Sequence, residues 1–234
     1  MGVAYKDIIK SVSDNQFEIL HNIQKLYLKG ENFDCDTTFS KGGFYDKGGI
    51  WNIAAPKYKF DVYPLSSDVT KIEPFGKWPG LEINSLKSIV IDLPFVCSPK
   101  PTKEQLDNPK SCIIATRFHG YYPIEEMFRS YYFFLYNAYK YLKPGGYCIF
   151  KCQPVVSGGK RYSTHYYTLQ VAESLGFHHR DEFILCAKSR LIGNIKRQEH
   201  ARCFHSYFYV FQKNDNTAKT RRIEYFKWRG KELN

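Results

Sequence analysis

Residues 89–95 are the part of the chain best suited to chemistry. An apolar, β-branched run ends there abruptly in Asp92, Pro94 and Phe95. A buried strand with this ending brings a carboxylate, a constrained backbone and a flat ring to one point. In open α/β sheets, ligands bind in the crevice beyond the carboxyl ends of the strands. An Asp-Pro turn after a strand is also a common structural feature, so the neighbouring segments have to distinguish the two interpretations.

Two further acids follow expected strands. Asp36 leads into a turn that holds Phe39, Gly42 and Gly43, and such a turn lets a ligand approach the backbone closely. The turn lacks the full GxGxxG fingerprint and is not a P-loop. Asp61 ends the next expected strand, where an acid can bind the two hydroxyls of a ribose. The alternatives are an isolated structural turn and an ordinary surface aspartate.

Helical and strand patterns alternate through the chain. Apolar residues recur every three or four positions in the expected helices, which cover residues 13–28, 123–143 and 165–175. Strands are expected over residues 32–38, 58–63, 88–92, 147–153, 183–187 and 204–211. Gly30 and Gly176 are expected to end the first and third helices, and Pro144 with two glycines to end the second. This alternation predicts an α/β fold with a mainly parallel sheet.

The composition is that of one folded domain. The chain has 234 residues, of which 43% are hydrophobic and 24% are charged, enough to bury a core. No apolar run reaches the roughly eighteen residues of a membrane span, and residues 1–10 lack the apolar region of a signal peptide. A cytoplasmic protein without a membrane partner is therefore expected. Seven cysteines without a CxxC pair indicate reduced thiols, and no metal is expected.

Cations and aromatic rings are both abundant. The net charge is +11, and the chain contains 19 Tyr and 18 Phe. Because phosphates attract cations and exposed bases stack on flat rings, this combination suits nucleic-acid binding. An aromatic-rich core beneath a basic surface has the same composition, so charge alone does not decide between them.

The order of these features resembles a known family. A glycine turn, the acid Asp61 and the Asp-Leu-Pro-Phe segment precede Leu-Lys-Pro-Gly-Gly at residues 142–146, and a late strand follows His200 and Arg202. This order is similar to that of class I S-adenosylmethionine-dependent methyltransferases, and more narrowly to phage and bacterial DNA methyltransferases acting on adenine N6 or cytosine N4. The resemblance covers about residues 30–213. It implies a Rossmann-like fold whose mainly parallel, twisted sheet has a late antiparallel strand.

The resemblance also implies a division of the chain and a cofactor. Residues 1–30 would be an N-terminal helical segment, residues 31–213 the methyltransferase domain and residues 214–234 a basic tail. The cofactor would be S-adenosylmethionine. Its expected contacts are Asp36, Phe39, Gly42, Gly43, Asp61 and Glu73, the last at the end of a third strand.

Catalytic roles follow from the same resemblance. Asp92 would accept a hydrogen bond from the exocyclic amino group of the target base, Pro94 would shape the backbone whose carbonyl takes the second hydrogen, and Phe95 would stack on the flipped base. An aromatic amine is a poor nucleophile because its lone pair is delocalised into the ring. Acceptors that hold both hydrogens favour the tetrahedral nitrogen that attacks a methyl group, and the base must leave the stack to reach them.

The expected activity is methyl transfer to adenine N6 in DNA. The expected nucleic-acid contacts are Arg117, His119, Lys160 and Arg161, the last two in a flexible loop over residues 157–161. The alternatives are an RNA base methyltransferase and a non-catalytic nucleic-acid-binding protein on a degenerate methyltransferase fold. Leu93 replaces the family's first proline and Ser40 the first glycine of its turn, and both keep the second alternative open. A homodimer or partner subunit is also compatible, since small enzymes of this type often need help to hold DNA.

Overall fold

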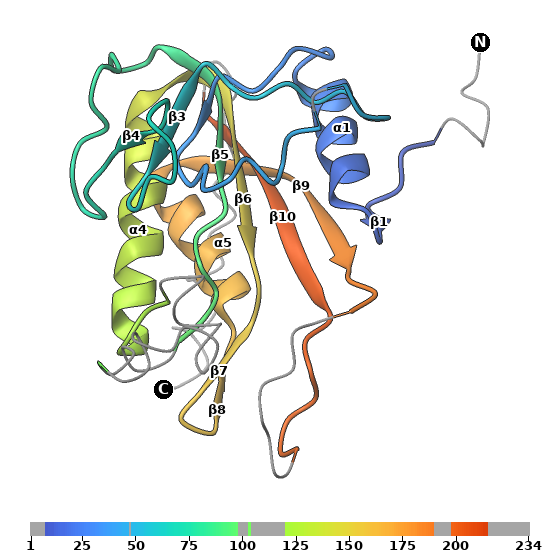
Figure 1. Ribbon diagram of the computed structural model, residues 1–234, viewed down its shortest axis with the longest axis vertical. Helices are drawn as coiled ribbons and strands as arrows, with labels where there is room; N and C mark the ends of the chain where they lie inside the picture. Colours follow the sequence, from blue (N-terminus) through green and yellow to red (C-terminus); the bar gives the residue numbers. More distant parts are fainter. Residues whose placement is uncertain (1–7, 47, 98–102, 104–119, 190–197, 215–234) are drawn as a thin grey trace, which may run out of the picture.

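The computed structural model describes residues 8–46, 48–97, 103, 120–189 and 198–214 (Figure 1). The helices are α1 (Gln16–Tyr27), α4 (Ile124–Tyr141) and α5 (Thr164–Leu175). The strands are β1 (Val12–Ser13), β2 (Cys35–Asp36), β3 (Tyr58–Asp61), β4 (Thr70–Lys71), β5 (Leu86–Ile91), β6 (Leu142–Cys152), β7 (Val155–Ser157), β8 (Lys160–Tyr162), β9 (Phe177–Cys186) and β10 (His205–Lys213). Among these residues, no helix combines the length and apolarity needed to span a bilayer.

Eight of the described strands form one sheet, in the order β1-β9-β10-β6-β5-β2-β3-β4. The run from β6 to β4 is parallel throughout. The last strand in the chain, β10, lies between β6 and β9 and is antiparallel to both. The expected Rossmann-like α/β architecture, with a mainly parallel sheet and a late antiparallel strand, is therefore confirmed.

Helices cover both faces of the sheet, with α4 and α5 on one side and α1 on the other (Figure 1). The period of two along the strands explains how each strand serves two cores. In β5, Ile89 and Ile91 pack with the α4 layer, whereas Val90 packs with Ile19 and Ile23 of α1. The division of the chain near residues 30 and 213 stays a prediction.

Several element boundaries differ from the expected ones. α1 begins later than residue 13, because the Asn15 side chain caps it by accepting the Phe17 N–H at 2.9 Å. α4 ends at Tyr141, before the Pro-Gly-Gly segment, and Leu142 is already extended. β9 begins at Phe177, well before residue 183. Its polar first half becomes a strand through pairing with β10, a long-range contact that local sequence does not reveal.

Gly146 lies where β5 and β6 approach closely. A Cβ atom at this position would lie 3.0 Å from the carbonyl oxygens of both Lys143 and Lys87. We expect Gly146→Ala to lower the free energy of unfolding by about 1–3 kcal/mol, because backbone atoms would have to shift. Urea denaturation measures the change, with Gly43→Ala as control because a Cβ there meets nothing within 4 Å. Equal midpoints for both variants would contradict the expectation.

Candidate active site

Four parallel strands end at the same edge of the sheet and bring the predicted acids together. Asp36 is the last residue of β2, Asp61 is the last residue of β3, and Asp92 directly follows β5. The register pairs Asp36 with Val90, and Ile91 with Phe150 of β6. The three acids therefore gather at the carboxyl edge of the sheet, which is where open α/β folds bind ligands.

Thr38 connects two of these acids. Its backbone N–H donates to Oδ1 of Asp36 at 2.8 Å, and its hydroxyl lies 3.2 Å from the same oxygen. The Thr38 hydroxyl oxygen also accepts the backbone N–H of Asp92 at 2.7 Å. The turn after β2 and the segment after β5 are thereby held together through one side chain.

Asp36 is a buried carboxyl group, with only 2% of the residue exposed. Burial raises its pKa to about 7, although hydrogen bonds from Thr38 and from the Tyr45 hydroxyl at 2.7 Å act in the opposite direction. Asp92 nearby raises the pKa further. Near neutral pH, Asp36 can therefore exchange a proton or balance a nearby positive charge.

The two oxygens of Asp92 have different surroundings. Oδ2 accepts a hydrogen bond from Nζ of Lys151 at 3.2 Å. Oδ1 is buried and has no hydrogen-bond partner among the described residues. Burial raises the pKa of Asp92, and the charge of Lys151 opposes this shift. A buried acceptor without a partner is costly, so Oδ1 is a position where a ligand N–H could bind.

Lys151 was not among the residues predicted from the sequence. Only 10% of its side chain is exposed, and its ammonium lies 4.8 Å from the ring centroid of Phe44, 5.4 Å from Phe208 and 5.7 Å from Phe95. These separations fall within cation–π range. The sequence feature that could have identified Lys151 is its position near the end of a largely apolar strand. A charge buried there requires a partner.

The glycine turn is built around aromatic rings and Asp61. Phe39 stacks on Tyr45 with centroids 5.5 Å apart. Oδ2 of Asp61 accepts the Ser40 N–H at 2.8 Å, and its Oδ1 accepts the Tyr63 N–H at 2.8 Å. Ser40 has a φ of 49°, a left-handed conformation that glycine adopts most easily. The serine thus adopts a backbone conformation in which a glycine would be less strained.

Gly42 is the position in this turn where a side chain is least tolerable. Its φ is +70°, and a Cβ atom would lie 2.9 Å from Cζ of Phe39. We expect Gly42→Ala to lower the free energy of unfolding by about 1–2 kcal/mol through backbone strain and displacement of the ring. Chemical denaturation measures the loss, and Gly43→Ala, which meets neither constraint, is the matched control. Similar losses in the two variants would argue against this role for Gly42.

The remaining residues of the Asp-Leu-Pro-Phe segment also have defined surroundings. Pro94 and Phe95 are partly buried, and Phe95 packs against the core beside α4. Leu93 is 3% exposed and belongs to that core. The leucine in place of proline is therefore a packing residue, and the Asp92 backbone is held by Thr38 instead.

The other residues predicted to bind cofactor or nucleic acid come from separate segments of the chain. Glu73 is exposed, two residues beyond the end of β4. Arg117 and His119 lie outside the described residues. Lys160 and Arg161 are exposed, but the loop expected over residues 157–161 is wrong, because β7 and β8 form a hairpin there. The hairpin forms because Gly158 and Gly159 supply positive φ angles of 56° and 72° at its turn.

Two histidines that were not among the predicted contact residues lie close to this hairpin. The His165 ring stacks on Tyr207 with centroids 4.9 Å apart. Burial lowers the pKa of His165, with smaller contributions from the charges of Arg161 and His205. Nε2 of His200 lies 2.8 Å from the Gly159 carbonyl oxygen. A group of cations and rings thus adjoins the carboxyl edge of β6.

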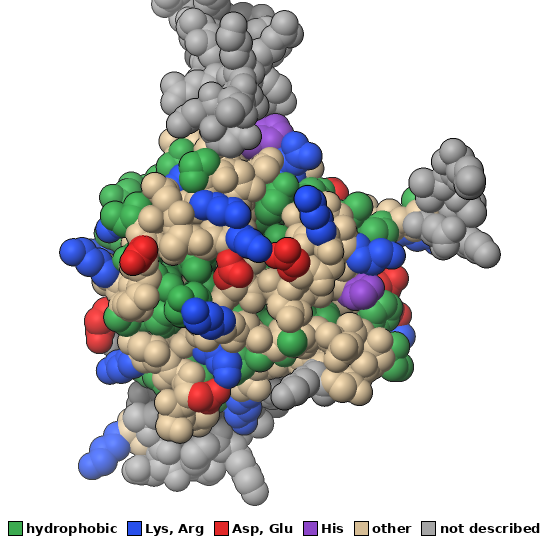
Figure 2. All heavy atoms as spheres, turned by 90° about the horizontal axis from the view of Figure 1, so that it is seen from above, with side chains coloured by type: hydrophobic (Ala, Val, Ile, Leu, Met, Phe, Trp, Pro, Cys, Tyr) green, Lys and Arg blue, Asp and Glu red, His purple; other side chains and the backbone are tan. Residues whose placement is uncertain are grey.

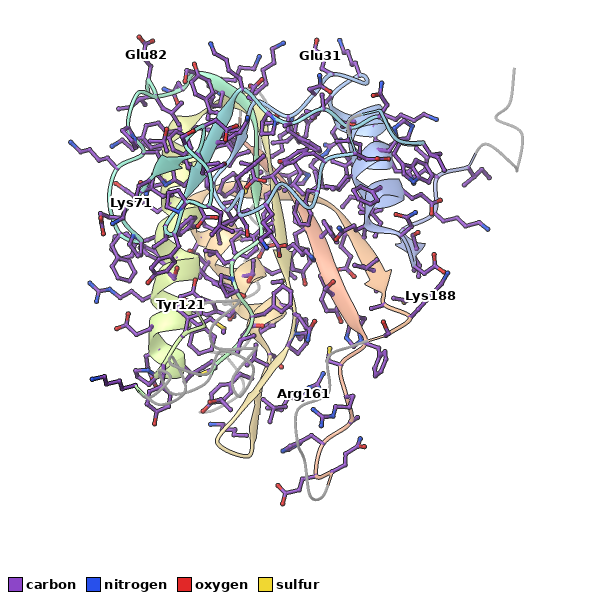
Figure 3. The ribbon with its side chains drawn as sticks, in the orientation of Figure 1. Glu31, Lys71, Glu82, Tyr121, Arg161 and Lys188 are labelled. Atoms are coloured by element: carbon purple, nitrogen blue, oxygen red, sulfur yellow. The ribbon has the colours of Figure 1, made fainter. Side chains whose placement is uncertain are left out.

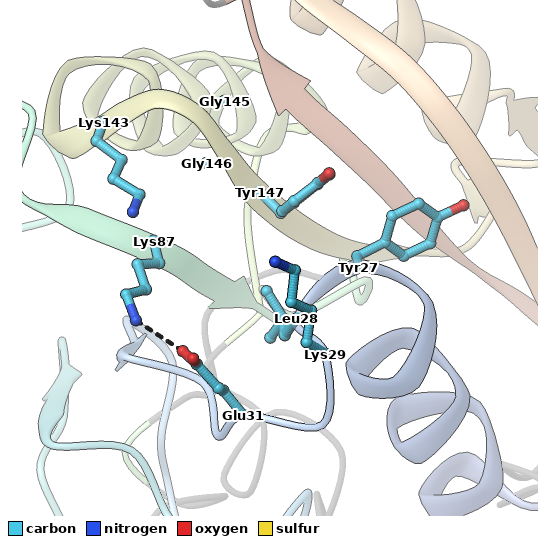
Figure 4. A pocket seen from close by; sticks show the side chains of 9 residues that line it. All are labelled: Tyr27, Leu28, Lys29, Glu31, Lys87, Lys143, Gly145, Gly146 and Tyr147. Atoms are coloured by element: carbon cyan, nitrogen blue, oxygen red, sulfur yellow. Dashed lines mark hydrogen bonds and ion pairs between the residues drawn. The ribbon is translucent and has the colours of Figure 1, made fainter.

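A cavity of about 230 Å³ lies at the other edge of the sheet (Figure 4). Its lining includes Lys29, Lys87 and Lys143, with Glu31 paired to Lys87 at 2.7 Å. Figure 3 shows Glu31 and Arg161 toward opposite ends of the long axis. This cavity is therefore separate from the carboxyl-edge site.

Seen from above in Figure 2, Lys and Arg side chains are interspersed with acidic ones, so the face in this view carries charges of both signs.

No protein-family model matches the chain, and no curated protein matches it. A Thermus thermophilus protein provisionally named a DNA modification methylase, solved with S-adenosyl-L-methionine, is 17% identical over 61% of this chain, with a TM-score of 0.37. The match spans about half of that protein, 54% of its length. The N-methyltransferase NodS of Bradyrhizobium japonicum is 13% identical over 86% of this chain and 98% of its own, with a TM-score of 0.45. A SAM-dependent methyltransferase of Archaeoglobus fulgidus is 15% identical over 84% of this chain and 94% of its own, with a TM-score of 0.43.

Proposed function

We propose that this protein is an S-adenosylmethionine-dependent methyltransferase that acts on an exocyclic amino group of a nucleobase, adenine N6 in DNA. The observation that carries the proposal is the hydrogen-bonded connection from Asp36 through Thr38 to Asp92. It joins the turn suited to a cofactor with the carboxylate suited to an amino group. Both must lie side by side if a methyl group is to pass between two bound molecules.

The residues of the turn fit this cofactor. Gly43 leaves the backbone open to close approach, because a Cβ atom there would meet nothing within 4 Å. Among the described residues, each Asp61 oxygen accepts one backbone hydrogen bond, which leaves lone pairs for ribose hydroxyls. The raised pKa of Asp36 means that a nearby cation would favour its ionised form. S-adenosylmethionine, when bound, supplies a methyl group attached to a positively charged sulfur.

Asp92 would hold the nucleophile. Its Oδ1, which lacks a partner among the described residues, would accept one hydrogen of the amino group. A backbone carbonyl near Pro94 would accept the other hydrogen, and Phe95 would stack on the base. Holding both hydrogens turns the nitrogen lone pair out of conjugation with the ring and toward the methyl group. Orientation of this kind contributes much of the rate in a bimolecular transfer.

A nucleic-acid substrate is supported by charge near this edge. The net charge is +11, and the exposed Lys160 and Arg161 lie on the β7–β8 hairpin, beyond the end of β6. Figure 3 shows Arg161 at the end of the molecule that carries this hairpin. Cations in this position suit phosphate contacts, which position a strand without reading its sequence.

The test is transfer of a labelled methyl group from S-adenosylmethionine to DNA and to RNA of matched sequence, followed by chromatography of the nucleosides. We expect label in N6-methyladenine from DNA. Label from RNA alone would replace DNA by RNA as the substrate. Absence of transfer, together with absence of S-adenosylmethionine binding by calorimetry, would reject the enzyme and favour a non-catalytic scaffold.

A further inference from the structure

Lys151 has one acidic partner among the described residues, and that partner is Asp92. We infer that Lys151 is a positioning residue that keeps Asp92 ionised and reserves its Oδ1 for a hydrogen-bond donor, so that the site selects amino groups over carbonyl groups. The inference rests on the proposed function and identifies a residue that would enforce its preference for an amino group.

The ammonium of Lys151 is confined. Its side chain is 10% exposed and surrounded by the rings of Phe44, Phe95 and Phe208. β10 lies alongside, with Phe208 directly opposite Lys151 in the register. A buried ammonium requires a counter-charge, and cation–π contacts add to its stabilisation when it is desolvated. The lysine is therefore held against Oδ2 of Asp92, which leaves Oδ1 for the ligand.

The other titratable groups near Asp92 do not replace this cation. Among the described residues they are Asp36 at the end of β2, Tyr45 in the segment after it, Tyr131 from α4 and Cys152 from β6. Burial raises the pKa of the tyrosines and of the cysteine, so these groups stay neutral, and an ionised Asp36 disfavours a second negative charge nearby. Within the described residues, the charge that favours ionised Asp92 comes from Lys151.

The protonation state of Asp92 decides which ligand atoms can bind. An ionised carboxylate only accepts hydrogen bonds, whereas a protonated one also donates. Amino groups of adenine and cytosine present donors, and the carbonyl groups of guanine and thymine present acceptors. Loss of the Lys151 charge would favour the protonated form of Asp92, which weakens amino binding and reduces the repulsion against a carbonyl oxygen.

The first measurement is the carboxyl pKa of Asp92 by ¹³C NMR, in protein without substrate. We expect Lys151→Met to raise this pKa by at least about one unit and Lys151→Arg to leave it within about half a unit, because only the first removes a charge in contact. Lys188→Met is the control, since Lys188 is exposed and pairs with Asp14 at the surface. Lys151→Gln tests the same loss of charge if the methionine variant does not fold.

The second measurement is the pH profile of kcat. We expect the acidic limb of Lys151→Met to move to higher pH with recovery at alkaline pH, and Lys151→Arg to restore the wild-type profile. An unchanged Asp92 pKa in Lys151→Met, or an activity loss that is equal at every pH, would overturn the inference. The proposed function fails separately, if the wild-type protein transfers no methyl group at any pH while the NMR shift is present.

Discussion

Asp92→Asn is expected to lower methyl transfer at least about 100-fold while leaving S-adenosylmethionine binding within about threefold. The reason is that the asparagine variant would place a hydrogen-bond donor opposite the donor of the substrate amino group. Lys151 requires an acceptor at the position of Oδ2, so the asparagine would turn its carbonyl oxygen toward the lysine. Its NH₂ group would then occupy the position of Oδ1 and point a donor at the donor of the substrate. Rates measured with saturating substrate, together with calorimetry of cofactor binding, separate the two effects.

Two variants sharpen this comparison. Asp92→Ala removes the acceptor without adding a donor. Its rate of methyl transfer should also fall, but by no more than that of the asparagine variant. Asp14→Asn is the control, because Asp14 is a surface residue paired with Lys188 and should keep the wild-type rate. Full activity in either Asp92 variant would show that the carboxylate does not hold the reacting group.

Asp36 is expected to make the protein less stable as the pH rises from about 4 to about 7. In the folded protein burial raises its pKa to about 7, whereas in the unfolded chain the carboxyl group ionises near pH 4. Between these values the folded state keeps a proton that the unfolded state loses. The free energy of unfolding therefore falls by up to about 1.4 kcal/mol per pH unit, and this contribution levels off above pH 7.

The measurement is urea denaturation of wild type and Asp36→Asn at several pH values from 4.5 to roughly 8. The asparagine cannot titrate, so the stability of wild type relative to the variant should decline across this window by a few kcal/mol. Gly43→Ala retains Asp36 and should follow the wild-type pH dependence. Parallel curves for wild type and Asp36→Asn would mean that the carboxyl group is ionised in the folded protein throughout.

Local sequence predicted the elements whose ends depend on neighbouring residues, such as helix caps and the ends of strands. The apolar run before Asp92 predicted β5 and its end, and the cap at Gly176 was recognised because glycine readily adopts the φ of 101° found there. The glycine turn after β2 was likewise visible, although the stacking of Phe39 on Tyr45 within it was not. β9 and the β7–β8 hairpin were less predictable, because their backbone groups find partners only after distant or flanking segments pair.

The candidate active site also divides into features that local sequence predicted and features that depend on long-range contacts. Residue types and their order along the chain determined that acids lie at the ends of successive strands and that a glycine turn follows the first of them, because strand ends and turns depend on short-range preferences. Only the tertiary structure decided that Thr38 bonds the Asp92 backbone across 54 residues and that Lys151 pairs with Asp92 across 59. Those contacts arise because β5 lies between β2 and β6 in the sheet, and burial there makes each unpaired charge costly. A lysine in an apolar strand thus acquires its partner from the order of the strands.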